Sequence, residues 1–166
     1  MCYYTSCNNA NGGKTLMAEK KTVFLTGASG HMGWAGFKEL YKKKDKLNIV
    51  LLLRDSEKNR KKFANYLNDP SVKIVWGDLK KYDDVLKCVE GSDYVLHVGG
   101  MVSPSADYYP TKTIQTNTTA AKNIVDAVKA QPNKDDIKVV YIGTVAQTGD
   151  RNAPIHWART GDPIKI

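Results

Sequence analysis

The stretch Thr22-Val-Phe-Leu-Thr-Gly-Ala-Ser-Gly-His-Met-Gly33 decides the fold of this chain. Its first half, Val23 to Thr26, is apolar or β-branched, which predicts a buried strand. The strand runs into a turn with three glycines, Gly27, Gly30 and Gly33, and an amphipathic helical pattern follows them. A strand, a glycine-rich turn and a helix in this order are typical of a dinucleotide-binding site.

The three glycines have separate roles in such a turn. We expect Gly27 to permit the tight bend, Gly30 to let a pyrophosphate approach the backbone, and Gly33 to let the helix pack closely on the strand. The free N–H groups and the positive end of the helix dipole would then face the phosphates. The alternative is an ordinary glycine-rich turn without a ligand.

Composition excludes several other classes of protein. The chain has 166 residues, of which 42% are hydrophobic, and this length suits one domain with a proper core. Neither a membrane span nor the apolar core of a signal peptide is present, which predicts a cytoplasmic protein without a membrane partner. The three cysteines and three histidines show no disulfide or ligand spacing, so we expect no metal.

The net charge of +8 raises the question of a polyanionic partner. The basic residues occur in short runs, Lys42–Lys44 and Arg60–Lys62, beside helical patterns. Solvated helix faces explain these runs better than a nucleic-acid surface does, and no nucleic-acid-binding module accompanies them. We therefore expect no nucleic-acid partner.

The pattern along the chain predicts a single α/β domain. Residues 1–20 are polar and aperiodic, and we expect a disordered leader followed by a folded domain over residues 21–166. Apolar runs predict further strands, at Asn48–Leu53, Ser71–Trp76, Asp93–Val98 and Ile137–Ile142. Helical patterns separate the strands, from Ser56 through Leu67, from Tyr82 to Gly91, and from about Tyr109 to Ala130. This alternation predicts a doubly wound parallel sheet, a Rossmann fold, with its ligand beyond the carboxyl ends of the strands.

Five motifs in order resemble the extended short-chain dehydrogenases/reductases, a family that includes nucleotide-sugar epimerases and dehydratases. Thr26–Gly33 looks like the TGxxGxxG signature, and Gly77-Asp78-Leu79 is similar to the element whose Asp contacts adenine. The other three segments resemble the HxAG, NVxGTxN and SSxxVYG motifs of the family, at His97–Gly100, Asn117–Asn123 and Gly143–Gly149. In the second of these, Ala120 and Ala121 replace Gly and Thr.

The resemblance implies hydride transfer between a nicotinamide cofactor and an alcohol or carbonyl of a small-molecule substrate. It makes Thr144 the catalytic Ser/Thr that hydrogen-bonds the reacting oxygen. It also implies contacts with the cofactor at Gly27, Ser29, Gly30, His31, Met32, Gly33, Arg54, Lys61, Asp78, Leu79, Gly99, Gly100, Met101 and Asn117.

The choice between NADP and NAD depends on the end of the second strand. An acidic residue there suits the ribose hydroxyls of NAD, whereas an Arg favours the 2′-phosphate of NADP. Arg54 stands at that end with Lys61 seven residues later, a spacing similar to that of NADP-dependent dihydroflavonol-type reductases. We therefore expect NADP, and Asp55 directly after Arg54 keeps NAD as the alternative.

The sequence departs from the family at the catalytic Tyr-x-x-x-Lys, which in relatives follows the Ser/Thr. No such motif follows Thr144, and Tyr108–Lys112, the one match by spacing, precedes it. We therefore expect an N-terminal fragment, truncated after the fifth strand, that lacks the substrate-binding region and is inactive alone. Its open sheet edge would favour self-association, for example as a homodimer. A non-catalytic dinucleotide-binding module, for redox sensing or partner binding, is the alternative function.

Overall fold

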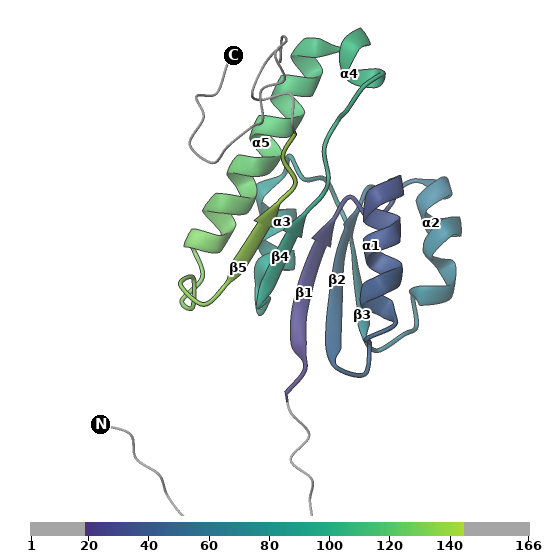
Figure 1. The fold of residues 1–166 in the computed structure, drawn as a ribbon, viewed down its shortest axis with the longest axis vertical. Coiled ribbons are helices and arrows are strands. Elements are labelled where there is room, and N and C mark those ends of the chain that lie inside the picture. The colour runs from purple at the N-terminus through teal and green to yellow at the C-terminus, as the bar shows by residue number, and fades with distance from the viewer. Residues whose placement is uncertain (1–18, 145–166) are drawn as a thin grey trace, which may run out of the picture.

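The computed structural model describes residues 19–144, which form a five-stranded, entirely parallel sheet (Figure 1). The strands are β1 (Lys21–Thr26), β2 (Leu47–Leu53), β3 (Val72–Trp76), β4 (Tyr94–His97) and β5 (Lys138–Tyr141). Their order across the sheet is β3-β2-β1-β4-β5. The chain therefore reverses its direction of travel at β1, which confirms the predicted doubly wound sheet and places a crevice between the ends of β1 and β4.

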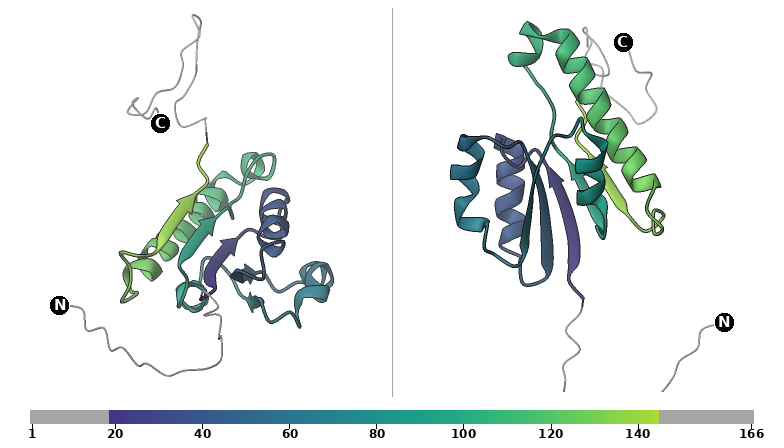
Figure 2. Two further views of the ribbon diagram at one scale, coloured as in Figure 1. Left: turned by 60° about the horizontal axis from the view of Figure 1, so that its bottom comes forward. Right: turned by 180° about the vertical axis from the view of Figure 1, so that it is seen from behind.

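The helices cover both faces of the sheet, as Figure 2 shows from behind. They are α1 (His31–Tyr41), α2 (Glu57–Phe63), the 3-10 helix η1 (Ala64–Tyr66), α3 (Tyr82–Val89), α4 (Ser105–Tyr108) and α5 (Pro110–Lys129). On one face, Phe37 of α1 and Phe63 of α2 are buried against Leu25 and Leu51. On the other face, α3 and α5 cover β1, β2 and β4 and form a second apolar cluster with them.

Two helices differ from the sequence expectation at their ends. The predicted helix through Leu67 is α-helical only to Phe63 and then tightens into η1, although Ser56 caps it as expected by accepting from the Asn59 N–H. Helix α5 begins with Pro110 at its first turn, also as expected, but the short α4 precedes it.

The N-terminal half of α5 extends beyond the sheet (Figure 1). A 20-residue helix is about 30 Å long, whereas four-residue strands such as β4 and β5 span about 13 Å. Ile114 is accordingly 66% exposed, while Ile124, further along the helix, is buried. The overhanging part of α5 stands beside the carboxyl ends of the strands, where a ligand is expected.

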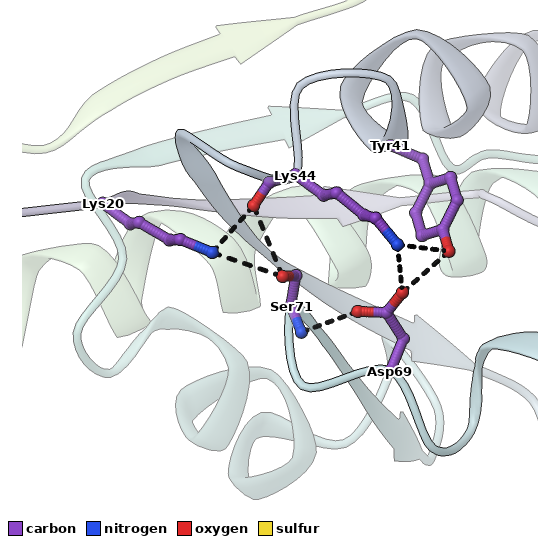
Figure 3. A network of polar contacts seen from close by, with 5 residues as sticks. All are labelled: Lys20, Tyr41, Lys44, Asp69 and Ser71. Carbon is purple, nitrogen blue, oxygen red and sulfur yellow. Dashed lines mark hydrogen bonds and ion pairs between the residues drawn. The ribbon is translucent and has the colours of Figure 1, made fainter.

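A polar network joins the segments that precede β1, β2 and β3, at the amino ends of the strands (Figure 3). The Asp69 carboxylate accepts from Lys44 Nζ at 2.9 Å, Tyr41 Oη at 2.7 Å and the Ser71 backbone N–H at 2.9 Å. These hydrogen bonds, from Lys44 first, lower the pKa of Asp69 to about 2. Lys20, at the end of the predicted leader, donates to the Lys44 carbonyl and so joins the network. The rest of that leader, residues 1–18, lies outside the described residues.

Within the described residues, β5 forms one edge of the sheet and is exposed along its whole length. Its apolar side chains Val139, Val140 and Tyr141 are 44%, 48% and 62% exposed. The expectations for residues 145–166 lie outside the described residues.

Candidate functional site

A cavity of about 520 Å³ lies at the carboxyl ends of β1 to β4, where the doubly wound fold predicts a ligand. The residue that follows each of these strands lines the cavity: Gly27 after β1, Arg54 after β2, Gly77 after β3 and Val98 after β4. The overhanging part of α5 closes its far side with Lys112, Thr116 and Ala120. These three residues are spaced by four and therefore share one helix face.

The glycine-rich turn is packed too tightly for side chains at two positions. Gly27 has φ +72°, and a Cβ there would lie 2.7 Å from the Cα of Gly99 in the turn after β4. A Cβ on Gly33 would lie 2.1 Å from the Gly27 carbonyl oxygen. Gly27 thus permits the bend and Gly33 the contact between α1 and the turn, as the sequence predicted.

Gly30 is different because the packing of the protein leaves room for a side chain at this position. The nearest atom to a Cβ at Gly30 would be the Gly27 carbonyl oxygen at 3.4 Å, an ordinary contact. Gly30 also caps α1 without a side-chain hydrogen bond, and the first turn of α1 holds no acidic residue. The N–H groups and positive dipole end of α1 therefore face the cavity, an arrangement that favours an anion.

A buried hydrogen-bonded group fixes the floor of the cavity. Thr26 Oγ1 accepts from the backbone N–H groups of Val98, at 3.1 Å, and Gly99, at 2.9 Å. The hydroxyl therefore directs its own proton to His97 Nδ1, 2.8 Å away, and the neutral ring carries its proton on Nε2. Burial lowers the pKa of His97, which favours this neutral form. The network holds the end of β4 against the end of β1.

Asn117 of α5 fixes the next residues of the same turn. Its Oδ1 accepts from the Met101 N–H at 2.8 Å, and its Nδ2 donates to the Met101 carbonyl at 3.0 Å. Asn117 therefore holds the Met101 backbone, which lines the cavity, and its expected contact with a cofactor stays a prediction. Asn123, two turns later, similarly donates to the carbonyl of Leu79 at 2.8 Å.

The two charged residues after β2 have different environments. Arg54 lines the cavity and has no acidic partner among the described residues. Asp55 forms a two-pronged ion pair with Arg60, at 2.6 Å and 2.8 Å, and the Arg60 guanidinium lies 4.8 Å from the centre of the Trp76 ring. The hydrogen bond from Arg60 lowers the pKa of Asp55. Arg54 thus lines the cavity, whereas the charge of Asp55 is paired with that of Arg60 and Asp55 is not part of the lining.

The cavity collects most of the residues that the sequence singled out. It is lined by Gly27, Ser29, Gly30, His31, Met32, Gly33, Arg54, Asp78, Leu79, Gly99, Gly100 and Met101. Within the described residues, Lys61, Asn117 and Thr144 are not part of the lining. Thr144 follows β5 after two residues, at the end of the described chain.

Three further lining residues, Gly77, Val98 and Ala120, lie in the quoted motifs but were not among the expected contacts. Sequence reasoning missed the others, namely Leu52, Lys80, Val102, Lys112 and Thr116. The spacing by four along α5 could have indicated Lys112, Thr116 and Ala120. It also missed Lys62, whose ammonium group donates to the Ser29 carbonyl at 2.9 Å.

Other kinds of site find no support in the described part of the chain. No cluster of His, Cys, Asp or Glu there could hold a metal ion, and no helix there has the length and apolarity to cross a membrane. Cys88 is buried without a disulfide partner, and burial raises the pKa of its thiol to about 12.

Solved structures with the same fold include two bacterial enzymes. The UDP-Glc/GlcNAc 4-epimerase from Campylobacter jejuni superposes with a TM-score of 0.70 at 17% identity, over 87% of this chain and 43% of that one. WbmH from Bordetella bronchiseptica, solved in complex with NAD⁺, gives a TM-score of 0.67 at 21% identity, over 89% of this chain and 46% of that one.

Sequence comparison identifies the family. UDP-glucose 4-epimerases from Rickettsia bellii and Rickettsia felis are 33% and 30% identical over 128 residues, which cover 75% of this chain. The chain spans 36% of the length of each of these curated relatives. The NAD dependent epimerase/dehydratase family model matches residues 23–164. The chain therefore belongs to the NAD-dependent epimerase/dehydratase family of extended short-chain dehydrogenases/reductases.

Proposed function

We propose that this chain binds a nicotinamide dinucleotide in the cavity, with the pyrophosphate against Gly30 and the first turn of α1. The open space beside Gly30 carries this proposal, because the packing of the protein does not explain a glycine there. The uncapped, acid-free first turn of α1 supplies N–H donors and a positive dipole to the phosphates. Membership of a family whose description names NAD supports the same ligand.

The adenosine half would lie toward β2 and β3, where Arg54 and Asp78 line the cavity. The nicotinamide half would lie toward Gly99, Met101 and α5. NADP is the preferred cofactor, because Arg54 is available for a 2′-phosphate whereas Asp55 is paired with Arg60.

Binding titrations test the cofactor and its phosphate separately. We expect the chain to bind NADPH more tightly than NADH, and Arg54→Ala to weaken NADPH binding by about tenfold or more with little effect on NADH. Lys129→Ala, which removes a cation from the far end of α5, is the control and should change neither affinity. Equal losses for the two cofactors in Arg54→Ala would refute the NADP assignment, and no binding of either would refute the site.

The reaction we propose is that of an NAD(P)-dependent oxidoreductase or nucleotide-sugar epimerase/dehydratase, acting on a nucleotide sugar as the names of the relatives suggest. The bound nicotinamide would supply or accept a hydride. Thr144 would hydrogen-bond the reacting oxygen, and the Thr26 and Asn117 networks would hold the turn after β4 beside it.

A dinucleotide-binding module without catalysis is the second candidate, because none of the described residues that line the cavity is a tyrosine. Tyr108, of the one Tyr-x-x-x-Lys spacing, is 78% exposed and outside the lining. Because this chain alone is expected to be inactive, the assay with cofactor and UDP-glucose needs a longer chain that carries a Tyr-x-x-x-Lys after Thr144. Turnover by that chain, lost in Thr144→Ala, supports the enzyme, whereas cofactor binding without turnover by it supports the module.

A further inference from the structure

The turn after β3 is held by a side chain that does not itself line the cavity. Asp84 stands in the first turn of α3, and its Oδ2 accepts from the backbone N–H of Asp78 at 3.1 Å. The Asp84 side chain is only 19% exposed. The adjacent Asp83 is exposed and makes no side-chain hydrogen bond or ion pair in the described structure. Of these two neighbouring aspartates, only Asp84 therefore reaches back to the chain that leaves β3.

Gly77 leaves the room that this hydrogen bond needs. A Cβ at Gly77 would lie 2.5 Å from Oδ2 of Asp84 and 2.7 Å from its Cγ, well inside van der Waals contact. The backbone of Gly77 is outside the left-handed region, so its conformation does not explain a glycine there. The close approach of the Asp84 carboxylate does explain it.

Hydrogen bonds fix Asp78 at three points. Its N–H donates to Asp84, and its carbonyl accepts from the Lys81 N–H at 2.9 Å. Its Oδ1 accepts from the Lys80 N–H, also at 2.9 Å. The other carboxylate oxygen, Oδ2, has among the described residues only the Lys80 ammonium group at 3.8 Å, which is beyond hydrogen-bond distance. Oδ2 is therefore available to accept a hydrogen bond from a ligand.

The Asp78 carboxylate suits one part of the proposed ligand. Asp78 is the only acidic residue among the described residues that line the cavity, and it lies on the side proposed for the adenosine half. The 6-amino group of adenine donates hydrogen bonds, and a carboxylate only accepts them. Because a hydrogen bond weakens steeply when its angle departs from the favoured range, this contact depends on where the main chain of Asp78 is held.

We propose that Asp84 is a positioning residue of the cofactor site, which holds the Asp78 carboxylate where it accepts from the 6-amino group of adenine. The inference rests on the proposed function and extends it to a residue outside the cavity. An acidic residue in a first helical turn also stabilises its helix through the dipole. Asp83 lies in the same first turn without the hydrogen bond, so the two aspartates separate these roles.

The affinities of the whole chain for NADH and for reduced nicotinamide hypoxanthine dinucleotide, measured by calorimetry, test this role. The second nucleotide has a 6-oxo group, an acceptor, in place of the amino group, so a carboxylate beside it disfavours binding. We expect the parent chain to bind NADH about tenfold more tightly or better. Asp84→Ala should reduce this preference to less than about threefold.

Three further variants separate positioning from general support of the fold. Asp84→Asn should keep most of the preference, because its amide oxygen can still accept from the Asp78 N–H. Asp83→Ala is the matched control and should keep all of it. Gly77→Ala breaks the same hydrogen bond by another route, since its Cβ displaces the carboxylate without removing it, and should lose the preference.

The remaining outcomes would overturn the inference. If Asp84→Ala weakens both nucleotides equally, Asp84 only supports the fold. The inference is also wrong if Asp84→Ala keeps the preference, if Asp83→Ala loses it, or if the parent chain binds the two nucleotides equally well. If the parent chain binds neither nucleotide while remaining folded by circular dichroism, the proposed function fails before the inference is reached.

Discussion

Thr26 Oγ1 and His97 Nδ1, one at the end of β1 and the other at the end of β4, lie 2.8 Å apart in the core. The two residues are paired in register across the sheet, and both are almost fully buried. Since the same hydroxyl accepts from the N–H groups of Val98 and Gly99, one side chain satisfies the backbone where the sheet opens into the cavity. The crevice between β1 and β4 is therefore held in place by hydrogen bonds as well as by packing.

Replacing this hydroxyl should destabilise the protein although the shape is kept. Thr26→Val leaves the Val98 and Gly99 N–H groups and His97 Nδ1 without their partner, and an unsatisfied buried polar group costs about 1–3 kcal/mol. We expect the free energy of unfolding, measured in urea, to fall by about 2 kcal/mol or more. Thr22→Val, in the same strand but without a side-chain hydrogen bond in the described structure, is the control and should be nearly neutral.

His97 should make the free energy of unfolding depend on pH in the range below 6.5, the ordinary pKa of a histidine. The folded ring is neutral with a lowered pKa, so below about pH 6.5 the unfolded chain binds a proton that the folded chain does not. Stability is therefore full above that pH and decreases as the pH falls toward the folded pKa. His97→Asn can still accept from Thr26 but cannot titrate. Urea midpoints at pH 7.5 and 5.5 should differ less for this variant than for the parent, and an equal difference would show that His97 is not responsible.

A second, more acidic transition should come from Asp69. Its pKa of about 2 in the folded protein lies below the ordinary value of 3.8, so its contribution is full above 3.8 and is lost as the pH falls toward 2. Asp69→Asn should lower the thermal midpoint at neutral pH and flatten its dependence on pH in this acidic window. Asp45→Asn, an exposed neighbour without an ion pair in the described structure, should do neither. If both variants behave alike, the network of Figure 3 contributes nothing specific.

The sequence predicted the strands and the glycine-rich turn because their signals are local, and the alternation of strands with helices predicted the parallel sheet. The apolar run of β2 and the glycines at 27, 30 and 33 can be identified within one strand or one turn. It did not predict the contacts of Lys62 and Asn117, which reach Ser29, 33 residues away, and Met101, 16 residues away. Spacing also could not show that Lys62, and not Lys61, contacts the turn, because this depends on which side of α2 packs against Trp34.

In helix α5, too, the local sequence pattern did not predict which apolar residues are buried. Ile114, Ile124 and Val125 all recur at helical spacing in this segment, but Ile114 and Val125 are 66% and 47% exposed, whereas Ile124 is buried. Helical spacing fixes which residues share a face, whereas burial depends on where the sheet ends, which no local pattern records. The part of α5 beyond the sheet lines the cavity with Lys112 and Thr116, so the mismatch in length between helix and strand contributes to the site.

Two glycines of α1 should respond to alanine in opposite directions. A Cβ at Gly33 would lie 2.1 Å from the Gly27 carbonyl oxygen, which belongs to main chain and cannot rotate away. Gly33→Ala should therefore cost roughly 3 kcal/mol, at the upper end for overpacking, and should abolish dinucleotide binding by displacing the turn. Gly36→Ala meets nothing within 4 Å and should stabilise the helix by up to about 1 kcal/mol with dinucleotide affinity unchanged. Urea unfolding and cofactor titration of the pair measure both effects. A Gly33→Ala variant as stable and as competent in binding as Gly36→Ala would mean that the close contact between α1 and the turn does not shape the site.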